Sequence, residues 1–506
     1  MKKIISVILI CIFVFFSFAS CGDSDKNVKT DKSEKTSPVS GGTLKLACVS
    51  PDTMNPIVTT HASVSDFLSL IYEGLFVLKP DLTVEGVLAK DYSVSANNTV
   101  YTIKLKDNIK FHSGKIFTAH DVVSTLNYMA LYSTRFKSFT QYIAGYMAED
   151  NNTLVIKLNS PKADFVNNLD FPVLPQGLMS EDFNAQNSSF VPNGTGMYEY
   201  TTTESYKNIK LTANDEWHGG KRPYIDNVDI EILSDEETIV SAFDAGAIDA
   251  ITTSWKGFGE LELTSSLFNT FEYEQNKFTY VGINCQHMYF DTAPERRLLK
   301  TSIDSDKITQ DIMLGHAVVA SSPIRDKAYY NLGQDNEDSF KEDIGKLPHG
   351  EFRLLYNSDS KTKSRIAQTL KQQLESAGYG VILDGQAYSA YCDKVAVGDY
   401  DLYIGEVLFT GSCDMQFMFS SPMGGLCNYD DSELRALVDN LDIVTGSEEK
   451  KTAWENFERY YANAAIQIPL YFTNGASFIS KRFGGSMKPN LSSSYYGLNN
   501  MYIKNN

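Results

Sequence analysis

The sequence predicts an α/β protein with at least two lobes. The body after residue 40 has about 465 residues, more than a single hydrophobic core usually organises. Two segments, residues 225–252 and 364–404, combine strands with a helix in the manner of an α/β unit. In the first, Asp235 caps a helix from Glu236 to Ala245, and we expect the flanking strands to form a parallel pair.

The first part of the body reads as a strand, a loop and a helix, at residues 41–47, 50–56 and 64–78. Alternating apolar residues then predict strands at 101–106 and 153–158. An inserted subdomain containing these two strands is expected from residue 81 to about residue 192.

Between these strands lies the stretch from Phe111 to Val123, Phe-His-Ser-Gly-Lys-Ile-Phe-Thr-Ala-His-Asp-Val-Val. Gly114 indicates a turn, and Thr118 with Asp121 forms a capping pair at the start of a helix. An apolar stripe follows on that helix, at Val122, Val123, Leu126 and Met129.

The remaining body alternates further helices and strands. A helix over residues 364–377 carries apolar residues four apart and ends at Gly378. The last thirty residues are expected to return to the first lobe. Further strands are predicted at residues 225–233, 248–252, 278–284, 381–383, 402–404 and 468–472, and further helices at 295–304 and 448–464.

The N-terminus reads as a targeting segment. Lys2 and Lys3 precede an apolar run over residues 4–16 that is short for a membrane span. Phe18-Ala-Ser-Cys21 resembles the lipobox of bacterial lipoproteins, which implies lipidation of Cys21 and an anchored protein outside the cytoplasmic membrane. An uncleaved N-terminal anchor is the alternative. Residues 21–40 are polar and predict a flexible tether.

Composition excludes several partners. The formal charge is −18, and cleavage after Ser20 removes two lysines and makes it −20. This acidity argues against nucleic acid and against anionic lipid surfaces as ligands. No later apolar run reaches about eighteen residues, so a transport role requires a separate membrane partner.

Cysteine usage leaves the redox state open. Apart from Cys11 and Cys21, five cysteines remain, an odd number without Cys-x-x-Cys spacing for zinc. A disulfide between Cys413 and Cys427, or between Cys285 and Cys413, is one reading, and buried thiols are the other. The five are Cys48, Cys285, Cys392, Cys413 and Cys427.

Enzyme motifs are missing from the sequence. It has no Gly-x-Ser-x-Gly elbow, no His-Glu-x-x-His and no Walker lysine, and its seven histidines lack metal-ligand spacing. We assign His112 a structural role. The chain has 29 Tyr and 29 Phe, and the pairs at 388/391, 400/403 and 495/496 suit either a ligand cleft or ordinary core packing.

The Phe111–Val123 stretch, with the strand before it, is similar to a motif of the bacterial family 5 solute-binding proteins. Ile71-Tyr-Glu-Gly-Leu-Phe76 and Pro192-Asn-Gly-Thr-Gly-Met-Tyr198 also resemble family phrases, as does the loop at residues 214–223. The two glycines of the second phrase permit a backbone path that a side chain would block.

The resemblance implies a bilobal, periplasmic-binding-protein-like α/β fold of type II, with two mixed-sheet lobes joined by a hinge. A lipoprotein signal peptide over residues 1–20 and the tether over 21–40 would precede it. The first lobe would comprise residues 41–80, 193–266 and 476–506, the inserted subdomain 81–192, and the second lobe 267–475.

The resemblance further implies a receptor of an ABC importer that captures peptides by closure of its lobes and delivers them to a membrane permease. Binding of a nickel chelate or an oligosaccharide, or peptide-pheromone signalling, are the alternatives. We expect a monomer without catalytic residues, cofactor or metal. Asp414 is the candidate partner of a peptide ammonium, since family members hold one with an Asp there. Trp255 is the candidate cleft wall.

Overall fold

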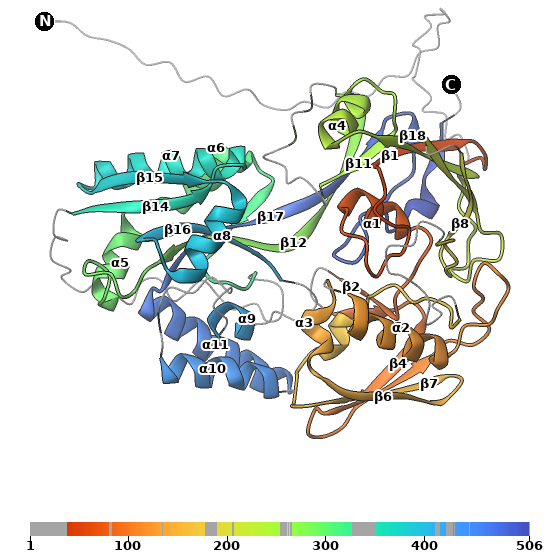
Figure 1. The fold of residues 1–506 in the computed structure, drawn as a ribbon, viewed down its shortest axis with the longest axis horizontal. Coiled ribbons are helices and arrows are strands. Elements are labelled where there is room, and N and C mark those ends of the chain that lie inside the picture. Colours follow the sequence, from red (N-terminus) through yellow and green to blue (C-terminus); the bar gives the residue numbers. More distant parts are fainter. Residues whose placement is uncertain are drawn as a thin grey trace, which may run out of the picture. The chain divides into compact units, whose positions relative to one another are not determined.

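The computed structural model places residues 38–506 in one compact unit. Within it, the structure describes residues 38–79, 83–133, 135–177, 190–204, 207–253, 266–325, 350–409, 415–420, 431–444 and 446–504, with residues 261, 263 and 429. Helices and strands below carry the labels of Figure 1.

The first lobe is built on a four-stranded sheet in the order β1-β10-β9-β8. β1 and β10 are parallel, and the other neighbours are antiparallel. Leu44 and Leu46 alternate on the buried face of β1, as its pattern predicts. The strands are β1 (Thr43–Val49), β10 (Asn227–Leu233), β9 (Asn208–Ala213) and β8 (Tyr198–Glu204).

The helix predicted after β10 is confirmed as α4 (Glu236–Asp244), and Asp235 accepts a hydrogen bond from the Thr238 amide. The expected parallel pairing across it is wrong. The following strand, β11 (Ala250–Thr252), pairs with β17 in another sheet, while β1 takes the place beside β10. The Asp249 carboxylate binds the Lys45 amide at the edge of β1, which directs the chain past β1 and away from β10.

The inserted subdomain has its own antiparallel sheet, in the order β4-β5-β7-β6. Helix α2 (Ala119–Tyr132) packs on β6 and β7. Its predicted capping box is confirmed: the Asp121 carboxylate accepts from the Thr118 amide at 2.8 Å and from the Thr118 hydroxyl at 2.9 Å. The strands are β4 (Ala89–Val94), β5 (Val100–Leu105), β7 (Thr153–Leu158) and β6 (Ile143–Asp150), and a short helix α3 (Lys137–Thr140) lies between α2 and β6.

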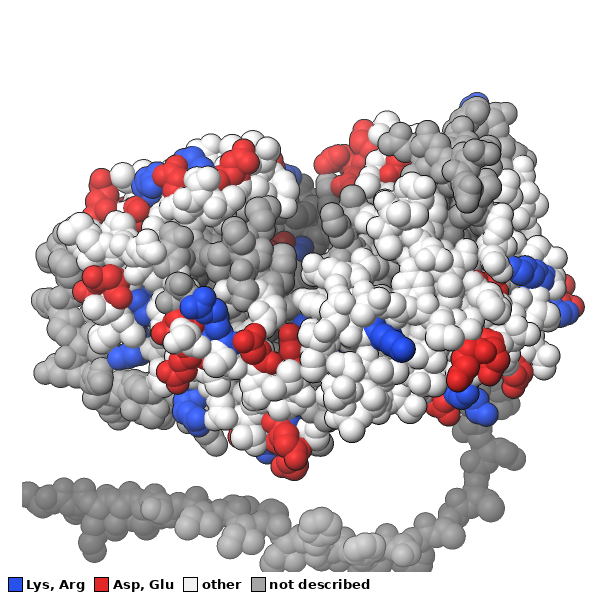
Figure 2. Space-filling model, turned by 60° about the horizontal axis from the view of Figure 1, so that its bottom comes forward, with Lys and Arg blue, Asp and Glu red and all other residues white. Residues whose placement is uncertain are grey.

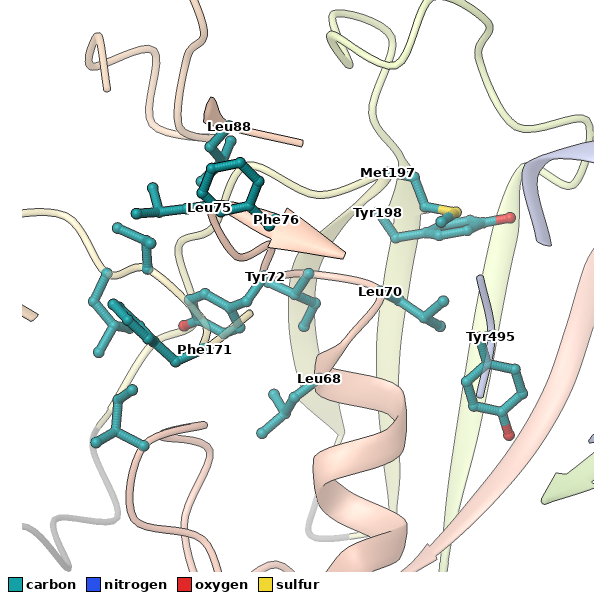
Figure 3. Packing of buried hydrophobic residues seen from close by; sticks show 14 of the residues in the cluster. Leu68, Leu70, Tyr72, Leu75, Phe76, Leu88, Phe171, Met197, Tyr198 and Tyr495 are labelled. Carbon is teal, nitrogen blue, oxygen red and sulfur yellow. The ribbon is translucent and has the colours of Figure 1, made fainter. Parts of the chain in front are cut away.

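The helix predicted over residues 64–78 is wrong beyond its first turns. Helix α1 (Ala62–Leu68) ends early, and β2 (Phe76–Leu78) pairs with β3 (Val84–Gly86). The carbonyls of Leu70 and Ile71 accept hydrogen bonds from backbone amides at residues 196 and 198, so tertiary contacts take groups that a helix would use. Figure 3 shows this segment, with Leu70, Tyr72 and Leu75, among packed apolar side chains.

The second lobe is built on a seven-stranded mixed sheet, ordered β11-β17-β12-β16-β14-β15, with β13 also on β17. Its predicted parallel unit is confirmed, because β14 is parallel to β15 on one side and to β16 on the other. Apolar residues of α6 and α7 pack on one set of sheet residues, and those of α10 and α11 pack on another. The new strands are β12 (Phe268–Ile283), β13 (Ala317–Val319), β14 (Glu351–Asn357), β15 (Gly380–Gln386), β16 (Leu402–Leu408) and β17 (Gln467–Ser480).

Helices surround this sheet in chain order. The amphipathic helix predicted from residue 364 is confirmed as α7, and it buries Ile366, Leu370 and Leu374. The predicted late helix is confirmed as α11. The helices are α5 (Ala293–Thr301), α6 (Ser305–Met313), α7 (Lys361–Ser376), α8 (Tyr388–Val397), α9 (Met415–Ser420), α10 (Ser432–Ile443) and α11 (Ser447–Ala464).

Strands β12 and β17 connect the cores of the two lobes. They pair antiparallel from Phe268 opposite Ser480 to Gly282 opposite Gln467, with a register shift between Glu274 and Lys277. Ile479 packs in the first-lobe core, and Ile468 at the other end packs in a second-lobe core. Apolar residues that follow β17 also join the first-lobe core, as expected of the C-terminus: Phe483, Met487, Tyr495, Leu498 and Met501.

The C-terminal segment is short in regular structure. It contains β18 (Phe483–Gly484) paired with β19 (Tyr502–Ile503), and a 3₁₀ turn at Leu498–Asn500. On the face shown in Figure 2, acidic and basic side chains are interspersed, so the net negative charge does not form one continuous patch there.

The glycines at 194 and 196 permit close packing, as predicted. A Cβ atom on Gly194 would lie 2.0 Å from the Ile71 carbonyl oxygen, which is backbone and has little freedom to retreat. Gly194→Ala should therefore lower the free energy of unfolding by roughly 2–3 kcal/mol or more. Urea denaturation measures the loss. Gly145→Ala is the control, because its Cβ meets nothing within 4 Å, and equal stability of the two variants would contradict the packing argument.

Candidate functional site

Glu73 joins three sequence motifs in the first lobe. One oxygen of its carboxylate accepts a hydrogen bond from the Trp217 indole at 2.9 Å. The other lies 2.8 Å from the Thr195 hydroxyl and 2.6 Å from Nε2 of His218. A half-buried carboxylate with these partners fixes the relative positions of the segments at residues 71–76, 192–198 and 214–223.

His112 brings the fourth motif to the same place. Its Nε2 lies 3.0 Å from the Gly196 carbonyl, and its backbone amide donates to the Gly194 carbonyl at 2.8 Å. Burial lowers the pKa of the imidazole, which favours the neutral form that can donate from one nitrogen and accept at the other. The structural role predicted for His112 is confirmed.

A cavity of about 660 Å³ lies against this junction, within the size range of small-molecule sites. Glu73, Gly74, Trp217 and His218 form part of its wall. Aromatic side chains from four separate segments supply apolar area: Tyr72, Phe136, Phe171 and Tyr496.

Charged groups of both signs also line the cavity. Burial raises the pKa of the Asp170 carboxyl, while a hydrogen bond from the Ser492 hydroxyl and the nearby Arg135 act in the opposite direction. The Arg135 guanidinium donates to the Ser65 hydroxyl on α1 at 2.7 Å. Acid, base and aromatic area in one cavity suit a ligand with charged groups and apolar parts.

The second lobe presents a further binding edge at the carboxyl ends of β14, β15 and β16. The chain passes from β14 to β15 on one side and then to β16 on the other, which creates the type of switch point where α/β sheets bind ligands. Helices α7 and α8 begin at this edge, and the Asp359 carboxylate accepts from the Tyr388 amide between them at 2.8 Å.

Glu406, near the end of β16, carries the charge at this edge. Its carboxylate lies 3.1 Å from the Lys277 ammonium and 3.0 Å from the Lys363 ammonium. Burial alone would raise the pKa of Glu406, but the two lysines overcome that effect and lower the pKa to about 2. Sequence reasoning missed this cluster, because its members come from β12, α7 and β16 and share no local pattern.

The committed site residues Asp414 and Trp255, and the lipidation residue Cys21, lie outside the described residues, as do Cys413 and Cys427. Cys285 is a free, buried thiol, so the alternative that pairs it with Cys413 does not hold. Cys48 and Cys392 are free as well.

The aromatic pairs divide between the two readings. Tyr400 and Tyr403 are buried in the second-lobe core, so packing explains them. Tyr388 is exposed at the switch-point edge, and Tyr496 lines the cavity while its neighbour Tyr495 is core. In the part of the chain that the structure describes, no three His, Cys, Asp or Glu side chains gather as metal ligands. No helix of that part has the length and apolarity of a membrane span.

Residues 83–423, more than half of the chain, match the family model described as bacterial extracellular solute-binding proteins, family 5 Middle. The chain belongs to family 5. It is therefore a solute-binding protein by family, and its relatives are named as binding proteins rather than enzymes.

Individual relatives extend the match over almost the whole chain. The oligopeptide-binding protein AppA of Bacillus subtilis is 24% identical over 92% of both chains. The solved ABC transporter substrate-binding protein CtaP of Listeria monocytogenes has a TM-score of 0.74 at 21% identity, and covers 92% of this chain and 99% of its own. The structure of NikA from Brucella suis with Fe(III)-EDTA has a TM-score of 0.74 at 18% identity, with 92% and 100% covered. These structural likenesses confirm the bilobal α/β fold of family 5.

The lowered pKa of Glu406 predicts a pH dependence of stability. A carboxyl whose pKa falls from 4.5 to about 2 on folding stabilises the fold above pH 4.5, and this contribution is lost as the pH falls toward 2. Solvent reaches 31% of the side chain, so screening makes the contribution smaller than the shift alone suggests.

Between pH 4.5 and 2, the free energy of unfolding should fall less steeply in Glu406→Gln than in the natural protein. Chemical denaturation at stepped pH measures both slopes. The exposed pair Lys110–Glu216 provides the control variant Glu216→Gln, which should keep the natural slope. Identical slopes in Glu406→Gln and the natural protein would contradict the assignment.

Proposed function

We propose that this protein is the lipid-anchored, extracytoplasmic substrate-binding protein of an ABC importer, and that its substrates are peptides. The observation that carries the proposal is the cavity at Glu73, where four family motifs meet beside aromatic and charged side chains. Similarity to an oligopeptide-binding protein over 92% of both chains supports peptides as the substrate class. The structure of AppA from Bacillus subtilis in complex with a nonapeptide supports the same class, with a TM-score of 0.66.

Capture would proceed by closure of the two lobes. Only a few chain segments connect the first-lobe core to the second-lobe sheet, and β12 and β17 are the long paired ones. Rotation about such a connection opens and closes a bilobal protein at small cost, since each lobe keeps its own core. The closed, loaded form would then dock on a membrane permease and ATPase complex.

Asp414 and Trp255 are proposed as ligand contacts. Asp414 follows β16 and its switch-point edge in the chain, where its carboxylate would hold the α-ammonium of a peptide through a charge-assisted hydrogen bond. Trp255 follows β11 closely and would supply an apolar wall. Peptide backbone groups and bridging waters would leave side-chain identity largely unread.

Cofactors have no part in this proposal, and the protein would act as a monomer on the outer face of the cytoplasmic membrane. A second substrate class, a metal chelate, is favoured by likeness to solved family structures that hold Fe(III)-EDTA or Ni(L-His). Oligosaccharide binding and peptide-pheromone signalling are the remaining alternatives, and the screen below distinguishes the ligand classes.

Peptide binding is tested by native mass spectrometry of protein from its own host, followed by a thermal-shift screen. Pooled peptides of two to eight residues should raise the melting temperature, since a ligand that binds only the folded state stabilises it by mass action. Pooled oligosaccharides and nickel–histidine are the comparison sets. Stabilisation by one of these sets and not by peptides would overturn the peptide assignment.

Asp414→Asn tests the ammonium contact. The substitution should weaken a free-amine peptide roughly tenfold or more, because the charge-assisted bond is lost, and should leave its N-acetylated form nearly unchanged. Isothermal titration calorimetry measures both affinities. Trp255→Ala should weaken both forms alike, so it is the matched variant. Equal losses for the two peptides in Asp414→Asn would remove the ammonium role.

Cys21→Ser tests the anchor. Without the acylated thiol, the protein should move from the membrane fraction to the soluble fraction, since two or more acyl chains are what hold it there. Fractionation with immunodetection and intact-mass analysis of the N-terminus measure the change. Cys392→Ser is the control and should stay with the membranes. Retention of Cys21→Ser on membranes would favour an uncleaved N-terminal anchor.

A further inference from the structure

A loop of the inserted subdomain contacts the ends of two second-lobe helices. The Lys162 ammonium lies 2.8 Å from the Asp442 carboxylate, and the Ala163 amide donates to the Asp442 carbonyl at 2.6 Å. The Lys450 ammonium lies 2.6 Å from the Asp164 carboxylate. We name this group the inter-lobe latch; it also includes Asn98, whose amide nitrogen donates to the Ile443 carbonyl at 3.0 Å.

The latch supplies hydrogen-bond partners that α10 lacks by itself. The last carbonyls of an α-helix have no partner within the helix. At the end of α10, the carbonyls of Asp442 and Ile443 accept from Ala163 and Asn98, so part of this helix end is capped by another part of the fold. The inserted subdomain therefore completes a second-lobe helix.

The latch charges also match the helix dipoles. The Lys162 ammonium lies at the C-terminal end of α10, where the dipole is negative, and the Asp164 carboxylate binds Lys450 in the first turns of α11, near the positive end. Two ion pairs of opposite order, each on the favourable helix end, make the contact specific in register.

Lys162 is committed to this contact. Its residue is only 1% exposed, and its ammonium also lies 4.7 Å from the centre of the Tyr142 ring. The Tyr101 hydroxyl donates to the Lys162 carbonyl at 2.6 Å, which holds the loop in place. A buried ammonium is costly when its acid partner is withdrawn, so separation of the two surfaces requires that Lys162 be rehydrated.

The loop leads directly to the cavity. The 3₁₀ turn at Phe165–Asn168 follows Asp164, and Asp170 and Phe171 in the cavity wall come next. Only a few residues separate Lys162, which contacts α10, from Asp170, which faces a ligand. A ligand that orders the cavity wall thus acts on the backbone that carries the latch.

We propose that the inter-lobe latch secures the closed arrangement of the lobes and slows the release of bound solute. The proposal rests on the proposed function for its second half, since release presupposes capture by closure. Its first half concerns the lobes alone and is measured without ligand. The latch complements β12 and β17: the strands connect the lobes covalently, and the latch joins them through side chains and helix ends that can separate.

The first experiment is hydrogen–deuterium exchange on the intact protein without ligand. The readout is the proteolytic fragment that contains the Ala163 amide, together with the radius of gyration from small-angle X-ray scattering. Asp442→Asn leaves the Lys162 ammonium without its acid and should speed exchange of this fragment roughly tenfold. Lys450→Met alters only the second ion pair and should give a smaller change in the same direction.

Lys307→Met is the matched control, because Lys307 forms an exposed ion pair with Asp311 within α6. It should leave exchange at Ala163 and the radius of gyration unchanged. Asp164→Asn, alone and with Lys450→Met, closes a double-mutant cycle, and Asn tolerates the left-handed φ of 55° at this position. Additive effects of the two substitutions would overturn the pairing across the lobes.

Unchanged exchange and radius of gyration in Asp442→Asn would overturn the latch itself, provided that its melting temperature shows a folded protein. The second experiment uses the pooled peptides of two to eight residues as the probe. Bound peptide should dissociate roughly tenfold faster from Asp442→Asn than from the natural protein or Lys307→Met. Absence of peptide binding in all three proteins would count against the proposed function, and exchange would then decide the latch alone.

Discussion

The antiparallel pairing of β12 with β17 is the constraint on which the rest of the fold depends. Each strand starts in the core of one lobe and ends in that of the other, so the two sheets are set by one shared register. The pair is irregular between Glu274 and Lys277. There the Arg325 guanidinium donates to the Gln275 carbonyl and to the Asn474 side chain, which fixes the bulge between the strands. Both lobes are therefore positioned by a connection with a defined irregularity at its middle.

The motifs that resemble family 5 are folding instructions that also build a site. Glu73 collects the indole of Trp217, the imidazole of His218 and the hydroxyl of Thr195, while Gly194 and Gly196 allow the backbone to approach residues 70–72. None of these groups needs a ligand for its own satisfaction. Their joint effect is a rigid wall, and the cavity exists because that wall faces the aromatic and charged residues of other segments.

Charge in this acidic protein is informative where it is buried rather than where it is abundant. The surface pairs are interspersed and exposed, so each contributes little. Asp170 in the cavity, Glu406 at the switch-point edge and Lys162 in the inter-lobe latch are different, because burial makes each charge depend on a particular partner. They lie where family function requires recognition or movement: two binding edges and one contact between lobes.

The sequence alone determined the local structure and the family. The capping box at Thr118 and Asp121, the apolar stripe of α7 and the strand–helix unit around β14 follow from short-range pattern, and the structure confirms them. Pattern failed at residues 69–78 and at the partner of β10, since distant backbone groups compete there for the same hydrogen bonds.

Tertiary structure alone decided which side chains meet. Glu406 with Lys277 and Lys363, and Lys162 with Asp442, join residues more than a hundred positions apart, and no spacing rule relates them. Periodicity reports which face of one element is buried, whereas a site is made where several elements converge. The amino-acid sequence thus names the family of this protein and most of its elements, and only the folded chain places its cavity and its inter-lobe latch.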